Sequence, residues 1–117
     1  MRTLCQLKEK IVSDPNHWAI YLMDFVDDFR YYQKVETIND PFEPTNERWD
    51  ALLASTAEYL CDELDLSTPS WLASIPACRT PWFVSGIERL KAITLAESPL
   101  RFRIRKIFVL ENFLSRA

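Results

Sequence analysis

The clearest hydrophobic pattern in the chain runs from Thr45 to Asp65. Apolar residues recur there at intervals of three and four positions, and they are Trp49, Leu52, Leu53, Ala57, Leu60 and Leu64. This spacing places them along one side of an α-helix, and the other sides take Asn46, Glu47, Asp50, Glu58, Asp62 and Glu63. Thr45 is a suitable N-cap residue. We therefore predict that this segment is the central helix of the fold.

Prolines that follow a serine, threonine or aspartate mark the other helix starts. An amphipathic helix is expected over residues 2–13, and Asp14-Pro15 begins a longer helix that ends near Tyr32. Shorter helical segments are expected after Pro69, Pro81 and Pro99. The aperiodic residues 33–44 are predicted to form a loop from which Phe42 packs back against the core.

The segment after Pro99 carries two conflicting patterns. Leu100, Phe102 and Ile104 alternate with arginines, a period of two that is typical of a strand, whereas the Ser-Pro start favours a helix. We predict a helical turn first, then an extended stretch over residues 106–109 with room for a small two-stranded pairing. A last helical turn is predicted over residues 111–116.

The composition agrees with a helical protein. The chain has 117 residues, enough for one domain with one core, and 48% of them are hydrophobic. Its one glycine argues against a hairpin-rich fold, a phosphate-binding loop and a dinucleotide fingerprint, which all need residues with positive φ. We predict an all-α fold: a single compact orthogonal bundle of about five to six helices over residues 1–117, with a short extended segment near the C-terminus. The residues expected to pack around the central helix are Phe25, Phe29, Leu90 and Phe108.

The N-terminal residues and the cysteines point to the cytoplasm. Residues 1–14 interrupt their apolar positions with charged ones, unlike a signal peptide, and no stretch of the chain has the apolar length of a transmembrane helix. Three cysteines, an odd number, favour free thiols in a reducing compartment. We expect a cytoplasmic protein without a membrane partner.

Charge is distributed unevenly along the chain. Residues 1–65 hold fourteen acidic and six basic residues, whereas residues 66–117 hold three acidic and eight basic ones. The densest basic stretch supplies four candidate partner-binding residues, Arg101, Arg103, Arg105 and Lys106. Three targets are open to them: carboxylates of the acidic half of the chain, an acidic protein partner, or a nucleic acid. The net charge of −3 disfavours nucleic acid, because that binding depends on neutralising phosphates.

No pattern in the sequence predicts catalysis or a bound cofactor. Four soft-ligand residues lack the paired spacing of a zinc site, and they are Cys5, His17, Cys61 and Cys78. Asp24, Asp27 and Asp28 share one side of a predicted helix and are the candidate ligands of a divalent cation. A solvated acidic surface is the simpler explanation of these three carboxylates. We therefore expect no enzyme activity, no cofactor and no bound metal.

Segments in both halves of the chain carry a resemblance to known proteins. They are Asp14-Pro15 to Phe29-Arg30, Pro81-Trp82-Phe83, Glu97-Ser98-Pro99, Phe102-Arg103, Arg105, Ile107-Phe108-Val109 and the closing Arg116-Ala117. These segments resemble the small helical domain of bacterial antitoxin-like proteins, which often follows a helix-turn-helix domain and is encoded beside a nucleotidyltransferase-like gene. Two features depart from that pattern: no helix-turn-helix precedes the domain here, and Lys106 stands where asparagine is expected.

The resemblance implies a helical domain that binds a protein of the toxin–antitoxin type. We expect a non-catalytic protein-interaction module of a bacterial cytoplasmic protein, with a nucleotidyltransferase-type toxin as the partner that the resemblance implies. One alternative is a nucleic-acid-associated regulatory domain that uses the basic stretch. The second alternative is a small metal-dependent enzyme that uses the three aspartates.

Overall fold

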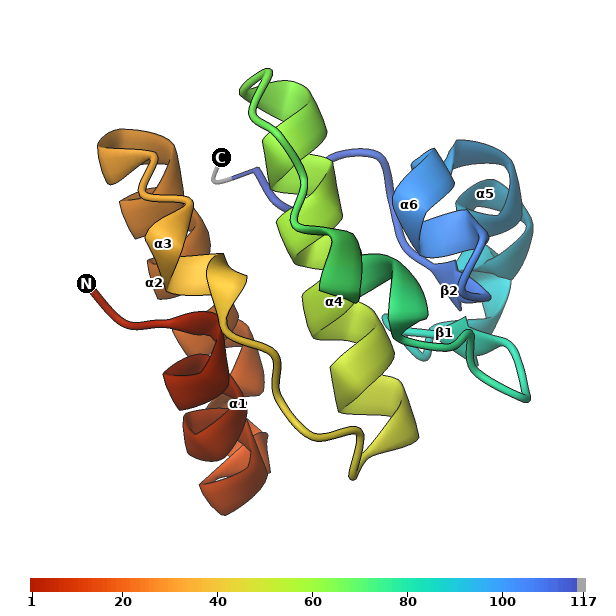
Figure 1. The fold of residues 1–117 in the computed structure, drawn as a ribbon. Helices are drawn as coiled ribbons and strands as arrows, with labels where there is room; N and C mark the ends of the chain where they lie inside the picture. Colours follow the sequence, from red (N-terminus) through yellow and green to blue (C-terminus); the bar gives the residue numbers. More distant parts are fainter. Residues whose placement is uncertain (116–117) are drawn as a thin grey trace.

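The computed structural model describes residues 1–115, and a long helix runs through the middle of them (Figure 1). The α-helices are α1 (Leu4–Ser13), α2 (Trp18–Tyr32), α3 (Glu36–Asn39), α4 (Glu47–Glu63), α5 (Lys91–Glu97) and α6 (Leu100–Arg103). Three 3-10 segments are η1 (Pro15–His17), η2 (Ser70–Ser74) and η3 (Glu88–Leu90), and two short strands are β1 (Trp82–Phe83) and β2 (Ile107–Phe108). The predicted all-α class and the compact bundle are confirmed.

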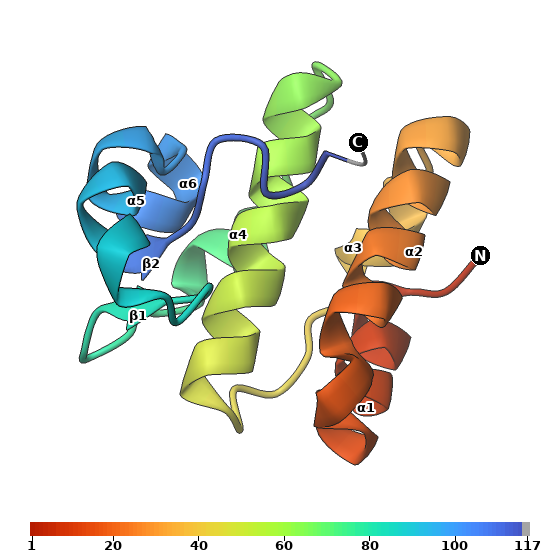
Figure 2. The same cartoon turned by 180° about the vertical axis from the view of Figure 1, so that it is seen from behind.

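Helix α4 is the central helix that the hydrophobic pattern predicts. Figures 1 and 2 show α1, α2 and α3 on one side of it and the β1, α5, α6 and β2 segment on the other. The N-cap is Asn46, whose side chain accepts a hydrogen bond from the amide of Trp49 at 3.2 Å, one residue later than the predicted Thr45. Because elements cover α4 from both sides, its residues from Asp50 to Ala57 are all buried.

The N-terminal helices begin at the residues that local chemistry favours. Thr3 caps α1 in a capping box with Gln6, and Pro15 occupies the first position of η1 just before α2. The loop expected over residues 33–44 contains one extra turn of helix, α3. Phe42 is buried as predicted, and its ring meets the ring of Trp71 edge-on with centroids 5.1 Å apart.

The C-terminal third differs more from expectation. The helix predicted after Pro81 is wrong at its start: Trp82 and Phe83 form β1, which pairs in parallel with β2. Gly86, at φ +67°, then turns the chain towards η3 and α5. The extended stretch after α6 is confirmed as β2, so the expected two-stranded pairing exists, but its partner lies some twenty-five residues earlier in the chain.

The end of the described chain forms turns in place of the predicted last helix. Phe113 donates its amide to the carbonyl of Leu110 at 3.0 Å, and Ser115 donates to Asn112 at 2.9 Å. Arg116 and Ala117, which the predicted helix and the resemblance included, lie outside the described residues. Within residues 1–115, no helix combines the length and the apolar character that crossing a bilayer requires.

The predicted core is largely correct, with two exceptions. Phe25 and Phe29 are buried beside α4, but Leu90 and Phe108 are only partly buried and lie outside the main core cluster. Phe108 instead stacks on Phe83 across the two strands, with ring centroids 5.1 Å apart. Three partly buried tryptophans pack against the core: the ring centroid of Trp49 lies 5.6 Å from those of both Trp18 and Trp82. Trp49 thus connects α2, α4 and β1.

Candidate functional site

The four candidate residues of the basic stretch separate into two that pair within the chain and two that face outward. Arg105 is only 4% exposed. One Nη donates to a carboxylate oxygen of Glu58 and, at 3.4 Å, to Oγ of Ser55. Its Nε donates to the carbonyl of Ile75 at 3.2 Å and the other Nη donates to that of Leu72 at 2.7 Å. Arg105, which lies between α6 and β2, therefore connects this segment to α4 and η2 in the interior of the fold.

Arg101 pairs with the same side of α4. Its Nε and Nη2 lie 2.7 and 3.0 Å from the two carboxylate oxygens of Asp62, a bidentate arrangement, and its Nη1 lies 3.6 Å from Glu58. The hydrogen bond to Asp62 raises the pKa of the Arg101 guanidinium, so the group stays charged. Two arginines of the basic stretch thus satisfy carboxylates of the acidic half of the chain, which was one of the three targets open to them.

Arg103 and Lys106 remain on the surface, together with two apolar side chains. Leu100 is 67% exposed and Ile104 is 54% exposed, and the two are four residues apart at α6. Arg103 donates to the carbonyl of Ser98 at 2.7 Å, and neither cation forms an ion pair within residues 1–115. We call Leu100, Arg103, Ile104 and Lys106 the C-terminal surface.

Lys106 has an unusual backbone. Its φ is +60°, in the left-handed region that few residues other than glycine and asparagine adopt easily. The amide of Trp82 donates to its carbonyl at 2.8 Å, next to the β1–β2 pairing, so the strand contact holds this conformation in place.

The burial of Glu58 and Asp50 was not predicted from the sequence, which placed both on the sides of the central helix away from the apolar stripe. Glu58 is 3% exposed and faces Arg105, and Asp50 is buried beside Lys8 of α1. The sequence did carry a signal for the pair of Arg105 with Glu58, since an arginine-rich stretch needs carboxylates. The periodicity of α4 alone could not show which carboxylates those are. Nothing in the sequence singled out Lys8.

A groove lies beside the Lys8–Asp50 pair, between α1 and residues 42–45. It has a volume of about 480 Å³ and is lined by Cys5, Lys8, Glu9, Val12, Ser13, Phe42, Glu43 and Thr45. Lys8 Nζ lies 2.8 Å from Asp50 Oδ1, donates to the carbonyl of Glu43 and sits 4.6 Å from the centroid of the Phe42 ring. The contact with Oδ1 has the length of an ion pair but lacks hydrogen-bond alignment, and Oδ1 accepts no hydrogen bond within the described chain.

The other residues considered for chemistry occupy ordinary structural positions. Cys61 and Cys78 are buried, and burial raises the pKa of both thiols, so they stay protonated at neutral pH. His17 is exposed and its Nδ1 lies 3.0 Å from a carboxylate oxygen of Asp14. That carboxylate also accepts a hydrogen bond from the hydroxyl of Tyr21 at 2.6 Å.

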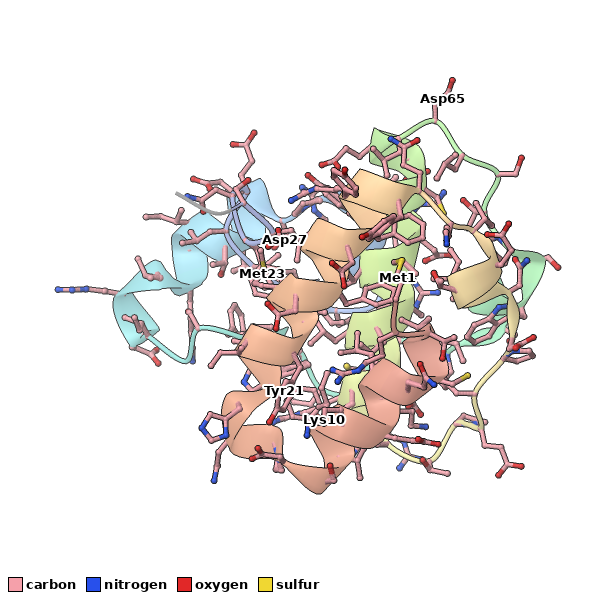
Figure 3. All side chains as sticks on the ribbon, turned by 90° about the vertical axis from the view of Figure 1, so that its left-hand side faces the viewer. Met1, Lys10, Tyr21, Met23, Asp27 and Asp65 are labelled. Atoms are coloured by element: carbon pink, nitrogen blue, oxygen red, sulfur yellow. The ribbon has the colours of Figure 1, made fainter. Side chains whose placement is uncertain are left out.

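The three aspartates of α2 lie along the outside of the fold, where Figure 3 labels Asp27. Asp24 and Asp28 border a small surface hollow with Arg2. Among residues 1–115, no group of three histidine, cysteine or acidic residues is arranged to hold a metal ion.

Comparison of the chain with protein-family models, with curated proteins and with solved structures finds no match.

Proposed function

We propose that the chain is a non-catalytic protein-interaction domain and that its partner binds the C-terminal surface. The observation that carries this proposal is the exposure of Leu100 and Ile104 beside two cations without carboxylate partners in the described chain. Large apolar side chains exposed next to each other are typical of interaction sites. The two cations would give such a site its preference for an acidic partner surface.

A protein fits this surface better than a nucleic acid does. Arg101 and Arg105 are already neutralised by Asp62 and Glu58, so Arg103 and Lys106 are the cations of the stretch that remain for phosphates. Tight binding of nucleic acid usually requires several phosphate contacts, and the rest of the chain is acidic. The apolar side chains of Leu100 and Ile104 would gain little from a phosphate backbone but much from an apolar protein surface.

The resemblance supplies the identity of the partner in this proposal, a nucleotidyltransferase-type toxin of a bacterial toxin–antitoxin pair. The backbone of Lys106 supports the resemblance. The expected residue at this position is asparagine, and asparagine is one of the few residues that tolerate the left-handed conformation found there. Lys106 thus has the backbone conformation that would suit the asparagine expected at this position.

The test is co-purification with the product of the neighbouring gene, followed by a binding titration at two salt concentrations. Arg103→Gln with Lys106→Gln should weaken the complex about tenfold at low salt and reduce its salt dependence. The melting temperature should fall by only a few degrees, because both side chains are exposed and the variant loses only the hydrogen bond from Arg103 to the carbonyl of Ser98. Lys34→Gln with Arg89→Gln removes two exposed cations elsewhere and should leave binding unchanged.

The proposal fails if the wild-type chain does not bind that gene product, or if both double variants bind it equally well. The nucleic-acid alternative would replace the proposal if the wild-type chain retarded DNA or RNA in a gel-shift assay at about 50 mM salt and the Arg103 and Lys106 variant did not.

A further inference from the structure

We propose that the groove between α1 and residues 42–45 binds a small organic cation, an aromatic or aliphatic body that carries one ammonium or guanidinium group. The groove lies across α4 from the C-terminal surface, as the positions of α1 and α6 in Figure 1 show. This site is therefore separate from the proposed protein-binding surface, and its test does not depend on that proposal.

The size and walls of the groove suit the apolar body of such a ligand. Its volume of about 480 Å³ lies within the range of small-molecule sites. Val12 on α1 is 51% exposed although it is aliphatic, and the Phe42 ring and the Cys5 side chain complete the apolar lining. A ligand that covered Val12 would remove apolar surface from water.

The charges around the groove select a cation. Lys8 lies among the lining residues, but its ammonium is taken up by Asp50, by the Glu43 carbonyl and by the Phe42 ring. The carboxylates of Glu9 and Glu43 also line the groove and form no ion pair within residues 1–115. An anionic ligand would meet both of these carboxylates and would have to compete with Asp50 for Lys8.

Glu9 also borders a second surface hollow together with Arg2 and Lys10, but neither of these cations lines the groove. Lys10 turns towards α2, where its Nζ lies 5.2 Å from the centroid of the Tyr21 ring, and Figure 3 shows the two side chains together. Lys10 and Glu9 are consecutive on the helix, so their side chains leave it in directions about 100° apart.

The thiol of Cys5 lies in the wall of the groove. Burial raises its pKa first, the nearby charges of Asp40 and Glu9 raise it further, and the charge of Lys8 lowers it. Its Sγ donates to the carbonyl of Asp40 at 3.3 Å. Cys5 is thus a neutral, weakly polar part of the wall, and a cation in the groove would lower its pKa.

The experiment is a titration of the isotope-labelled chain with three ligands that share one aromatic body. Phenethylamine carries the positive charge, 2-phenylethanol is neutral and phenylacetate is negative. Phenethylamine should shift the backbone amide signals of residues 5–13 and of Phe42, Glu43 and Thr45 with a dissociation constant on the order of 1 mM. We expect 2-phenylethanol to bind several-fold more weakly and phenylacetate to cause no saturable shift.

Variants separate the charge from the apolar wall. Glu9→Gln with Glu43→Gln should raise the dissociation constant of phenethylamine about five- to tenfold and leave that of 2-phenylethanol unchanged. Val12→Arg should abolish the binding of both ligands, because it replaces the apolar wall. The fold should be retained because Val12 is half exposed, and the amide signals outside the groove will show this. Asp65→Asn with Glu111→Gln changes the net charge by the same amount at exposed sites outside the groove and is the matched control.

Three results would overturn the proposal. If the three ligands bind with equal affinity, the groove is an apolar surface without charge selectivity. If phenylacetate binds most tightly, the charge of Lys8 determines which ligands bind there. Shifts caused by a basic peptide but not by phenethylamine would make it a protein-docking site.

Discussion

Helices α2 and α4 share the same pattern of apolar and acidic residues but have different roles in the fold. Each has a tryptophan at or near its start, an apolar stripe and three or more carboxylates. In α4 the carboxylates of Asp50, Glu58 and Asp62 meet Lys8, Arg105 and Arg101. In α2 the aspartates lie along the outer surface, with Asp24 and Asp27 exposed to solvent.

The difference comes from what covers each helix. Elements pack on both sides of α4, so the carboxylates of Asp50 and Glu58 in its middle turns leave water and need a cation. Nearer its ends, Glu47, Asp62 and Glu63 remain exposed. Helix α2 packs against α1 and α4 but is uncovered on the side that faces the viewer in Figure 2, and Asp24 and Asp27 stay exposed. A charged position on an amphipathic helix therefore does not by itself reveal whether the charge is solvated. The following experiments test this comparison.

The largest effect is expected from Glu58→Gln. It leaves the guanidinium of Arg105 buried without its counter-charge and should reduce the free energy of unfolding by about 3–5 kcal/mol in urea denaturation. Glu63→Gln is the matched control on the same helix, because the pair of Glu63 with Arg30 is partly exposed. Equal losses in the two variants would mean that the burial of Glu58 has no energetic consequence.

A second contrast compares the apolar residues of the two helices. Leu53→Ala removes a fully buried side chain of α4 and should cost about 2–5 kcal/mol, because a cavity remains. Ile20→Ala shortens a side chain of α2 that is largely exposed, and should change stability by less than about 0.5 kcal/mol. Thermal and urea unfolding of both variants measure this. A large loss for Ile20→Ala would show that α2 is covered by something that the isolated chain lacks, such as a second copy.

Arg101→Gln should reduce the free energy of unfolding by only about 0.2–1 kcal/mol, because the ion pair of Arg101 with Asp62 is partly open to water. The loss should shrink in high salt, since screening weakens the wild-type pair. Urea denaturation at two salt concentrations tests both points. A loss as large as that of Glu58→Gln would show that Arg101 contributes mainly through its second contact, at Glu58.

The smallest effect concerns pH and Asp14, which lies before α2. Hydrogen bonds from Tyr21 and then from His17 lower the pKa of this carboxyl below its ordinary value of 3.8. Because the folded pKa is lowered, the carboxylate stabilises the fold above the unfolded pKa, and this contribution is lost as the pH falls through the folded pKa. Asp14→Asn should therefore be less stable than the wild type at neutral pH, and the gap should close in acid. An NMR titration of the Asp14 carboxyl checks the direction of the shift, and a pKa above the ordinary value would contradict it.

The sequence by itself determined the helical class, the central helix and most of its core. The spacing of Leu52, Leu53, Ala57 and Leu60 defines a stripe that must be buried somewhere, whatever the partner. Proline located the start of η1 and of α6: Pro15 is the first residue of η1 and Pro99 is the N-cap of α6, where the fixed φ is suitable and no amide donor is needed. The groove beside α1 left no trace in the sequence, since its lining residues come from two separate segments.

The tertiary structure alone decided the roles of the charged residues. Arg103 and Arg105 are two positions apart in one basic stretch, yet the first is exposed and the second is buried against Glu58. The pairing of β1 with β2 and the hydrogen bond from the amide of Cys78 to the carbonyl of Arg105 hold the backbone of Arg105 in place, and they join segments about twenty-five residues apart. Local periodicity reports the faces of one element, but whether a charge on a face is solvated depends on which distant element packs against it.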